Sequence, residues 1–329
     1  MVYYIGDTAA PLLQRMQWGD NTIWMCKDTW KGAAGNGGRK RLMKDKIRKV
    51  LTVISLAVIL LVGLALLLYP AVADYANSVQ SNTVIAEYQE KVDELDEDIY
   101  ASILEQVREH NAYIAENMPY IARLSEERRK IYNELLDLTG TGIMAYIDIP
   151  KVNVFLPIYH GTSDSVLSMG IGHFEGSSLP IGGESVNTVL SGHSGLPSAK
   201  LFTDLDQLVI GDTFIIRVLN EALVYEVDKI DVVQPRELEN LHIIEGMDYC
   251  TLTTCTPYGI NTHRLAIRAH RIEVPEEERP AYGIDENGGH EQKAGWHLEL
   301  LIVPAVVIVA LILTMVIVTS VRRRKRKKT

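Results

Sequence analysis

Two long apolar runs constrain this 329-residue chain more than any other feature. Residues 50–69 and residues 300–321 form runs of 20 and 22 residues without a charged side chain. A helix that rises about 1.5 Å per residue needs about 20 apolar residues to cross the hydrocarbon core of a bilayer. Core helices of soluble proteins are shorter or amphipathic. The sequence therefore predicts two transmembrane helices.

Basic residues beside the two runs predict their orientation. Seven Lys or Arg residues stand between Arg39 and Lys49, and seven more stand between Arg322 and Lys328. Such flanks stay on the cytoplasmic side, so we expect both termini inside the cell and residues 71–297 outside. The alternative is that the first run belongs to a signal peptide that is cut just after it.

The distribution of charge argues against a nucleic-acid partner. Residues 1–70 and residues 298–329 each carry a net charge of +6, whereas residues 71–297 carry −21, which gives the chain its net −9. A nucleic-acid binder needs its basic surface on the folded domain. The first 42 residues lack periodicity, and Met43 opens a basic stretch, so we expect translation to begin at Met43.

Patterns along the chain predict its organisation. Apolar positions recur at helical spacing from residue 76 to residue 136, with a break at Pro119. From Gly140 onward, short β-branched and aromatic runs are separated by Gly, Pro, Asn and Asp, which is typical of a mostly β barrel. Two short helices are expected within it, over residues 163–169 and residues 198–208. The predicted parts are a cytoplasmic segment (1–49), a membrane anchor (50–69), an extracellular helical region (71–140), a β-barrel domain (141–274), a linker (275–297), a second span (300–321) and a basic tail (322–329).

Two of the three cysteines lie close together in the predicted barrel. Cys250 and Cys255 share one short strand, where a separation of five residues puts them on opposite faces and roughly 16 Å apart. A disulfide needs Cα atoms within about 7 Å, so we do not expect these two to pair. We interpret Cys250 as a core residue and Cys255 as a free thiol with a function.

Three residues in the predicted barrel suggest acyl transfer. Cys255 ends one strand and Arg264 begins the next, so an antiparallel pair would bring them together. His193 stands in a Gly-flanked loop after an earlier strand. A neighbouring cation favours the thiolate, His can protonate a leaving amine, and Arg can hold an oxyanion. Together they describe catalysis through a thioester.

The motif TLTTC, followed by Arg264 and preceded by Gly192-His193, resembles the signature of the sortases. The similarity extends from Gly142 to Ile272, through GIMAYIDIPKVNVFLPIYHGTS, GHFEGSSLPIGGESVNTVLSGHSGLPSAKLFTDLDQL and TLTTCTPYGINTHRLAIRAHRI. These stretches are similar to class C sortases, which polymerise pili, and a second C-terminal span is also common in that class. The resemblance implies an eight-stranded β barrel with N-terminal helices.

The resemblance also implies a reaction and its partners. The chain would be a membrane-bound cysteine transpeptidase of a Gram-positive bacterium. Cys255 would attack the Thr–Gly bond of an LPXTG-like sorting signal, His193 would protonate the leaving amine, and Arg264 would hold the substrate and oxyanion. The acceptor would be a lysine amine on another pilin. Three alternatives stay open: attachment of surface proteins to a peptidoglycan precursor amine, simple hydrolysis, and a non-enzymatic membrane scaffold.

The sequence departs from the class C pattern in two ways. Class C enzymes usually carry a lid with an Asp-Pro-aromatic plug, and this chain contains no Asp-Pro, so we expect an open active site. Ser194 follows the histidine where relatives often have a basic residue. No zinc-ligand spacing, EF-hand loop or phosphate-binding loop occurs, so we expect neither metal nor cofactor. We interpret His160 and His263 as residues that serve in packing or in loop hydrogen bonds and take no direct part in the reaction.

Overall fold

The computed structural model describes residues 13–18, 21–26, 35–117, 123–235, 237 and 241–275. The chain divides into two compact units, Met1–Leu67 and Leu68–Thr329. In the first unit, strands β1 (Leu13–Trp18) and β2 (Asn21–Cys26) form an antiparallel pair. The sequence analysis does not anticipate this hairpin.

Helix α1 (Gly35–Asp93) contains the first predicted membrane span. Within the described part of the chain it is the one helix long and apolar enough to cross a bilayer, with a mean hydropathy of 3.0 in its most apolar window. The predicted span stops at residue 69, and α1 continues past it through Pro70 into the predicted helical region. Pro70 has no backbone N–H to donate, which costs a helix about 3 kcal/mol. The helix continues because no capping residue stands beside Pro70 to end it. The second predicted span at 300–321 lies outside the described residues.

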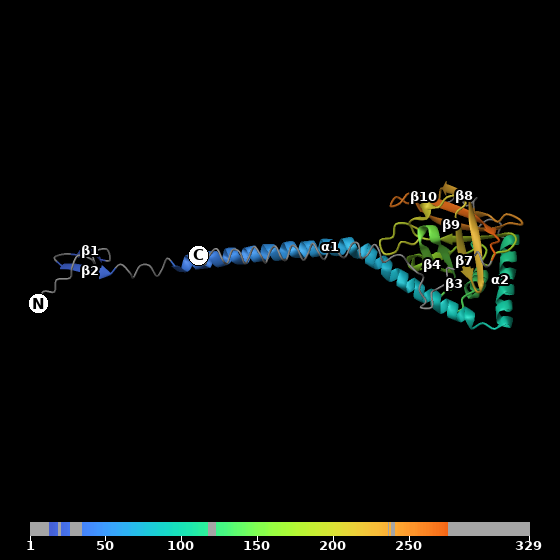
Figure 1. Cartoon of the computed structure of the whole chain (residues 1–329), viewed down its shortest axis with the longest axis horizontal. Coiled ribbons are helices and arrows are strands. Elements are labelled where there is room, and N and C mark those ends of the chain that lie inside the picture. The colour runs from blue at the N-terminus through green and yellow to red at the C-terminus, as the bar shows by residue number, and fades with distance from the viewer. Residues whose placement is uncertain are drawn as a thin grey trace. The chain divides into compact units, whose positions relative to one another are not determined.

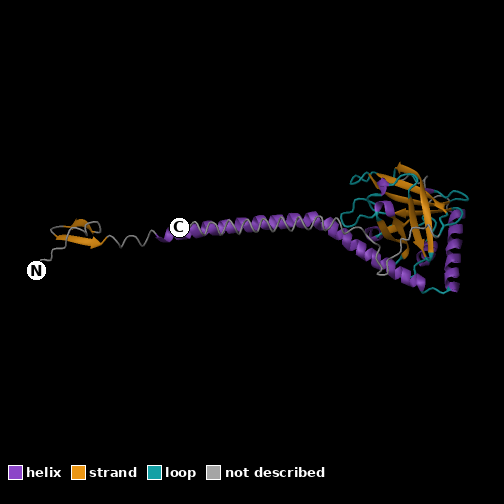
Figure 2. Ribbon diagram, in the orientation of Figure 1, coloured by secondary structure: helices purple, strands orange, loops and turns teal. Residues whose placement is uncertain are grey.

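A closed barrel of eight strands forms most of the second unit (Figures 1 and 2), as predicted. Its strands are β3 (Ile143–Ile149), β4 (Val154–His160), β5 (Ile171–His173), β6 (Val186–Ser191), β7 (Thr213–Val218), β8 (Glu221–Val233), β9 (Asp248–Thr256) and β10 (His263–Ile272). Around the barrel the order is β10-β8-β7-β3-β4-β5-β6-β9. All neighbouring pairs are antiparallel except β4–β5 and β6–β9, which are parallel. The three-residue β5 is too short to be predicted from its pattern.

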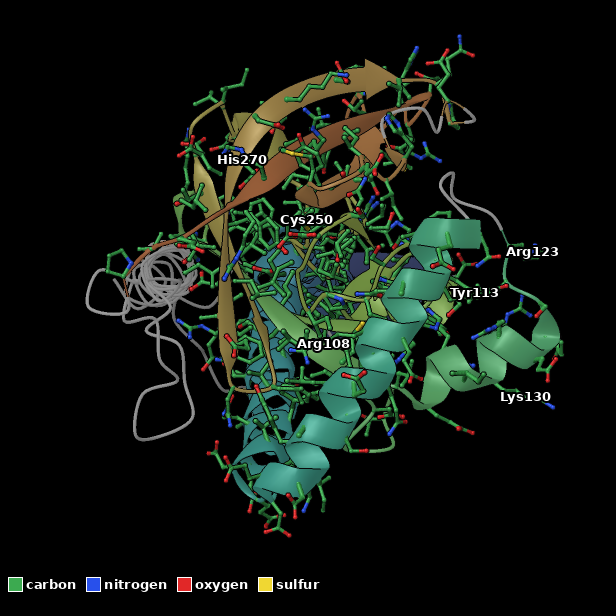
Figure 3. All side chains as sticks on the ribbon, turned by 90° about the vertical axis from the view of Figure 1, so that its right-hand side faces the viewer. Arg108, Tyr113, Arg123, Lys130, Cys250 and His270 are labelled. Carbon is green, nitrogen blue, oxygen red and sulfur yellow. The ribbon has the colours of Figure 1, made fainter. Side chains whose placement is uncertain are left out.

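Helices α2 (Glu97–Asn117) and α3 (Glu126–Glu134) lie beside the barrel (Figure 3). Helix α4 (Asp164–Met169) begins after its N-cap Ser163, as predicted. Two 3₁₀ turns, η2 (Pro150–Val152) and η3 (Leu205–Gln207), complete the described helical elements. The predicted break at Pro119 lies outside the described residues.

The predicted helix over residues 198–208 is wrong, since only the single turn η3 forms there. Leu201, in the middle of that stretch, adopts a left-handed conformation with φ +41°. A helix cannot continue through such a residue. The next residue donates its backbone N–H to the carbonyl of His193 instead of to a helical partner.

Buried polar groups fasten the helices to the barrel. The Tyr88 hydroxyl of α1 donates to the Met144 carbonyl at 3.0 Å and accepts from the Leu219 N–H at 2.9 Å. Asn111 of α2 makes two hydrogen bonds with the backbone of Leu179. Because buried polar groups require partners, these bonds specify where each helix packs.

Candidate active site

The threonines of the TLTTC motif bind strand β9 to strand β6 and to the loop that follows it. In the parallel β6–β9 register, Ser191 lies opposite Thr253. The Thr254 hydroxyl donates to the Gly192 carbonyl at 2.8 Å, and the Gly192 N–H donates to the Thr253 carbonyl at 3.1 Å. His193 follows Gly192, and Cys255 follows Thr254. These bonds therefore hold the start of the loop that carries His193 (residues 192–204, the histidine loop) against the residues of β9 that directly precede Cys255.

Arg264 approaches Cys255 from the other side. In the antiparallel β9–β10 register the two residues are directly opposite, as the sequence analysis predicts. Directly opposed residues point to the same face of a sheet. The Arg264 Nη1 donates to the His263 carbonyl at 3.1 Å and to the Asn261 carbonyl at 3.4 Å, which holds the guanidinium at the end of the barrel.

Two glycines let the histidine loop pack closely. A Cβ at Gly192 would lie 2.7 Å from the buried Phe202 ring and 2.8 Å from Ile171, so only glycine fits there. Gly195 has φ +78°, and a Cβ there would lie 3.0 Å from the Tyr258 ring. Tyr258 belongs to the β9–β10 loop, so this contact joins the histidine loop to the loop between Cys255 and Arg264.

The three predicted residues thus stand on three adjacent segments of the structure. Cys255, His193 and Arg264 are each partly exposed at this end of the barrel. The other thiol on β9 is different: Cys250 is fully buried inside the barrel (Figure 3), and burial raises the pKa of its thiol well above the ordinary value. Both thiols are free, and the strand places them on opposite faces as expected.

A pocket of about 90 Å³ opens beside Arg264 on the outer face of the barrel. Its walls combine apolar side chains with hydroxyls, one carboxylate and the guanidinium. The lining residues are Phe174, Ser191, Val233, Gln234, Pro235, Glu237, Leu241, Thr253, Arg264 and Ala266. Such a mixed wall suits an extended peptide with both apolar and polar side chains.

Other polar residues serve structural roles. Both ring nitrogens of His160 lie within 2.9 Å of backbone carbonyls, those of Gly142 and Leu135, and His263 contacts the Thr262 hydroxyl. This agrees with their interpretation as packing or loop residues. Among the described residues, no group of three or more His, Cys, Asp or Glu side chains is placed to hold a metal ion.

Sequence reasoning missed three residues that shape this site. Thr254 and Tyr258 hold the histidine loop, and Ser191 lines the pocket. Their pairing depends on the register between β6 and β9, which are separated by more than 55 residues. The only available signal was their closeness in sequence to His193 and Cys255.

Comparison with known proteins identifies this arrangement. Residues 147–272 match the family model described as the sortase domain. The structure resembles that of sortase C1 from Streptococcus agalactiae, with 48% sequence identity and a TM-score of 0.57, over 59% of this chain and 100% of that one. The chain belongs to the sortase family. Sortases are cysteine transpeptidases, and the site described above has the groups that such chemistry needs.

Two further relatives extend the comparison. Sortase C from Clostridium perfringens, crystallised with the C-terminal cell wall sorting motif, is 38% identical with a TM-score of 0.51, over 58% of this sortase and 99% of that chain. Sortase D from Bacillus subtilis is 30% identical over 113 residues, which are 34% of this sortase and 54% of that protein. This sortase therefore spans about half the length of the curated relatives it matches, or less.

Proposed function

We propose that this sortase cleaves an LPXTG-like sorting signal and joins the released carbonyl to a lysine amine of a pilin. The observation that carries the proposal is the strand register, which aligns Arg264 with Cys255 and ties the His193 loop to the residues before Cys255. Nucleophile, proton donor and oxyanion ligand then lie on neighbouring segments, as acyl transfer requires.

The reaction follows from these three groups. The Cys255 sulfur attacks the threonine carbonyl carbon, and Arg264 holds the oxygen as it gains negative charge. The carbon–nitrogen bond to glycine breaks, and His193 donates a proton to the departing amine. The lysine amine then attacks the thioester and loses a proton to His193. The carbon–sulfur bond breaks, which restores Cys255 and leaves an isopeptide bond.

The pocket beside Arg264 supports binding of the sorting signal. The Thr253 hydroxyl donates its proton to the Leu190 carbonyl at 3.1 Å. The Ser191 hydroxyl, 2.8 Å from the Thr253 hydroxyl, therefore donates its proton to Thr253 and keeps its lone pairs as acceptors toward the pocket. A peptide N–H or a threonine hydroxyl would complete this site as donor.

Two relatives support the pilin reading over attachment to the cell wall. Both the Streptococcus agalactiae and the Clostridium perfringens structures are named sortase C, the class that this chain resembles in sequence. The sorting motif in the second structure supports the LPXTG-like substrate. The identity of 48% to the first is high enough to carry a shared substrate class into the proposal.

We also propose a two-pass topology with the barrel outside the cell and both termini in the cytoplasm. The apolar part of α1 supports the first span, and the basic flanks support the orientation. Labelling intact cells with a membrane-impermeant thiol reagent tests it, because Cys255 would react from outside. Protection of Cys255 in intact cells, with reaction after lysis, would refute the topology.

Mass spectrometry of the full chain in detergent tests the reaction. The protein is mixed with an LPXTG-type peptide, with and without a lysine-bearing pilin domain. We expect an acyl adduct on Cys255 that passes to the pilin lysine. Cys255→Ala should form no adduct, whereas Cys250→Ala, on the same strand, should react normally. An adduct that passes only to water or oligoglycine would refute pilin polymerisation, and no adduct would refute the transpeptidase.

A further inference from the structure

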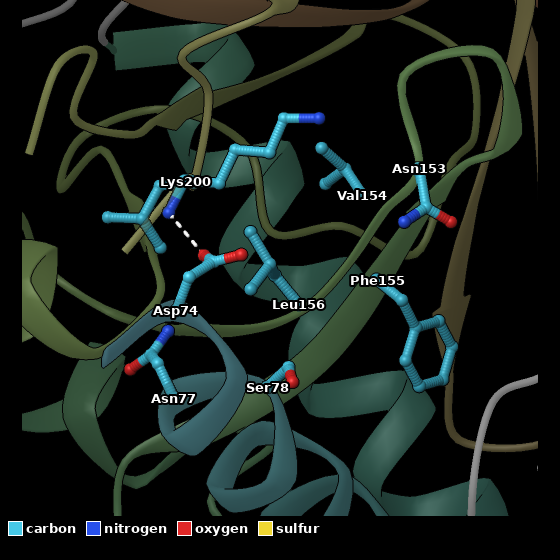
Figure 4. A pocket seen from close by; sticks show the side chains of 9 residues that line it. Asp74, Asn77, Ser78, Asn153, Val154, Phe155, Leu156 and Lys200 are labelled. Carbon is cyan, nitrogen blue, oxygen red and sulfur yellow. Dashed lines mark hydrogen bonds between the residues drawn. The ribbon is translucent and has the colours of Figure 1, made fainter. Parts of the chain in front are cut away.

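The histidine loop is held at its far end by helix α1. The backbone N–H of Lys200 donates to the Asp74 Oδ1 at 2.7 Å (Figure 4), across 126 residues of sequence. Asp74 follows the apolar run of α1 by five residues. It also lines a small pocket of about 50 Å³ with Asn77, Ser78 and Lys200.

A short chain of contacts leads from this bond to His193. Lys200 is followed by Leu201, whose left-handed φ of +41° places a buried side chain in a strained turn. The next residue, Phe202, donates its N–H to the His193 carbonyl at 3.1 Å. Its ring packs against Gly192, directly before the histidine.

Leu201 and Phe202 pack in the core, whereas the polar contacts of the Lys200 side chain are weaker ties. The Lys200 ammonium pairs with Asp204 at 2.5 Å, within the loop itself, and makes a long 3.4 Å contact with the Val152 carbonyl. A charge-assisted hydrogen bond from a backbone N–H to a carboxylate is stronger than a neutral one. The Asp74 bond is therefore well suited to hold the strained turn.

We infer that Asp74 is a positioning residue for His193, acting through the Lys200 backbone and Phe202. This inference rests on the proposed catalytic role of His193. In this arrangement, the helix that carries the membrane anchor also supports the active site. Displacing a catalytic group by about 1 Å can lower a rate by about a hundredfold. Loss of the bond should thus lower the turnover number kcat much more than it weakens substrate binding.

Three variants of the full chain in detergent test the inference, each measured by peptide transfer and by hydrogen exchange of residues 193–204. Asp74→Ala should lower kcat at least tenfold, change KM less than twofold, and speed exchange in the loop. Asp74→Asn should retain most of the rate, because its amide oxygen still accepts from Lys200. Asn77→Ala, one turn along α1 and lining the same pocket, should behave as wild type.

Two outcomes would overturn the inference. A loop that exchanges faster in Asp74→Ala with unchanged kcat would show that the bond does not position His193. An equal loss in Asp74→Asn and Asp74→Ala would assign the effect to charge and not to the hydrogen bond. His193→Ala serves as the reference: if it keeps full activity, the proposed role of His193 fails, independently of Asp74.

Discussion

Tyr132 joins α3 to the barrel through one buried hydroxyl that bonds to His173 and Gly161. The Nε2 of His173 lies 2.9 Å from the Ser178 carbonyl, so it carries the proton and donates. The Nδ1 of His173 is then an acceptor, and the Tyr132 hydroxyl donates to it at 3.0 Å. The same hydroxyl accepts from the Gly161 N–H at 2.9 Å. Tyr132→Phe would leave the buried His173 Nδ1 and the partly buried Gly161 N–H without this partner.

The expected loss can be worked from these contacts. A buried polar group left unsatisfied costs about 1–3 kcal/mol, and because Gly161 is only partly buried we expect about 3 kcal/mol for the two groups together. For a folded unit of this size, that corresponds to a fall in melting temperature of about 6–12 °C. The energy should appear as a lower free energy of unfolding of the barrel at neutral pH.

Pulse alkylation of Cys250 during a urea titration measures this free energy. Cys250 is fully buried, so its labelling reports opening of the barrel, independently of α1. Tyr113→Phe is the matched control, because the Tyr113 ring lies 3.6 Å from the Arg128 guanidinium and a Phe ring keeps that contact. If Tyr132→Phe changes stability no more than Tyr113→Phe does, the hydroxyl does not fasten α3 as argued.

Three further predictions concern packing, pH and access. Gly192→Ala would put a methyl group 2.7 Å from Phe202, which should cost about 1–3 kcal/mol and lower peptide transfer at least tenfold; normal transfer would contradict the close packing. Burial lowers the pKa of His110 to about 4 and that of His173 to about 3, against 6.5 for the free side chain. The unfolded chain therefore binds protons below pH 6.5 that the folded protein does not, so stability is constant with respect to these groups above pH 6.5 and falls as the pH drops toward these values. Among the described residues neither ring nitrogen of His110 has a hydrogen-bond partner. His110→Leu should therefore raise stability at pH 7 and flatten its fall between pH 6 and 5 by about 1 kcal/mol per pH unit; an unchanged slope in denaturation followed by circular dichroism would refute this. Finally, an open site predicts that iodoacetamide labels Cys255 in the folded protein at a rate close to that of a free peptide thiol, whereas labelling as slow as that of Cys250 would reveal a cover over the site.

Much of the barrel was predictable because strand signals are local. Alternating β-branched residues and Gly, Pro or Asn turns marked seven of the eight strands, and Cys255 and Arg264 could be paired because only a short loop separates them. The helix expected over residues 198–208 failed because the contacts that decide its shape come from His193 and Asp74. Local propensity carries no information about such distant partners.

The sequence by itself indicated the family of the protein and the proposed chemistry of its site. A thiol, an imidazole and a guanidinium in a recognisable pattern, between apolar runs with basic flanks, limit the chain to few functions. Only the tertiary structure decided how those groups are held. The parallel pairing of β6 with β9, the close packing at Gly192 and the bond from Asp74 to the histidine loop join segments up to 126 residues apart. Such contacts form only when segments from different elements pack together, because strand register and tertiary packing set them and local sequence preference does not.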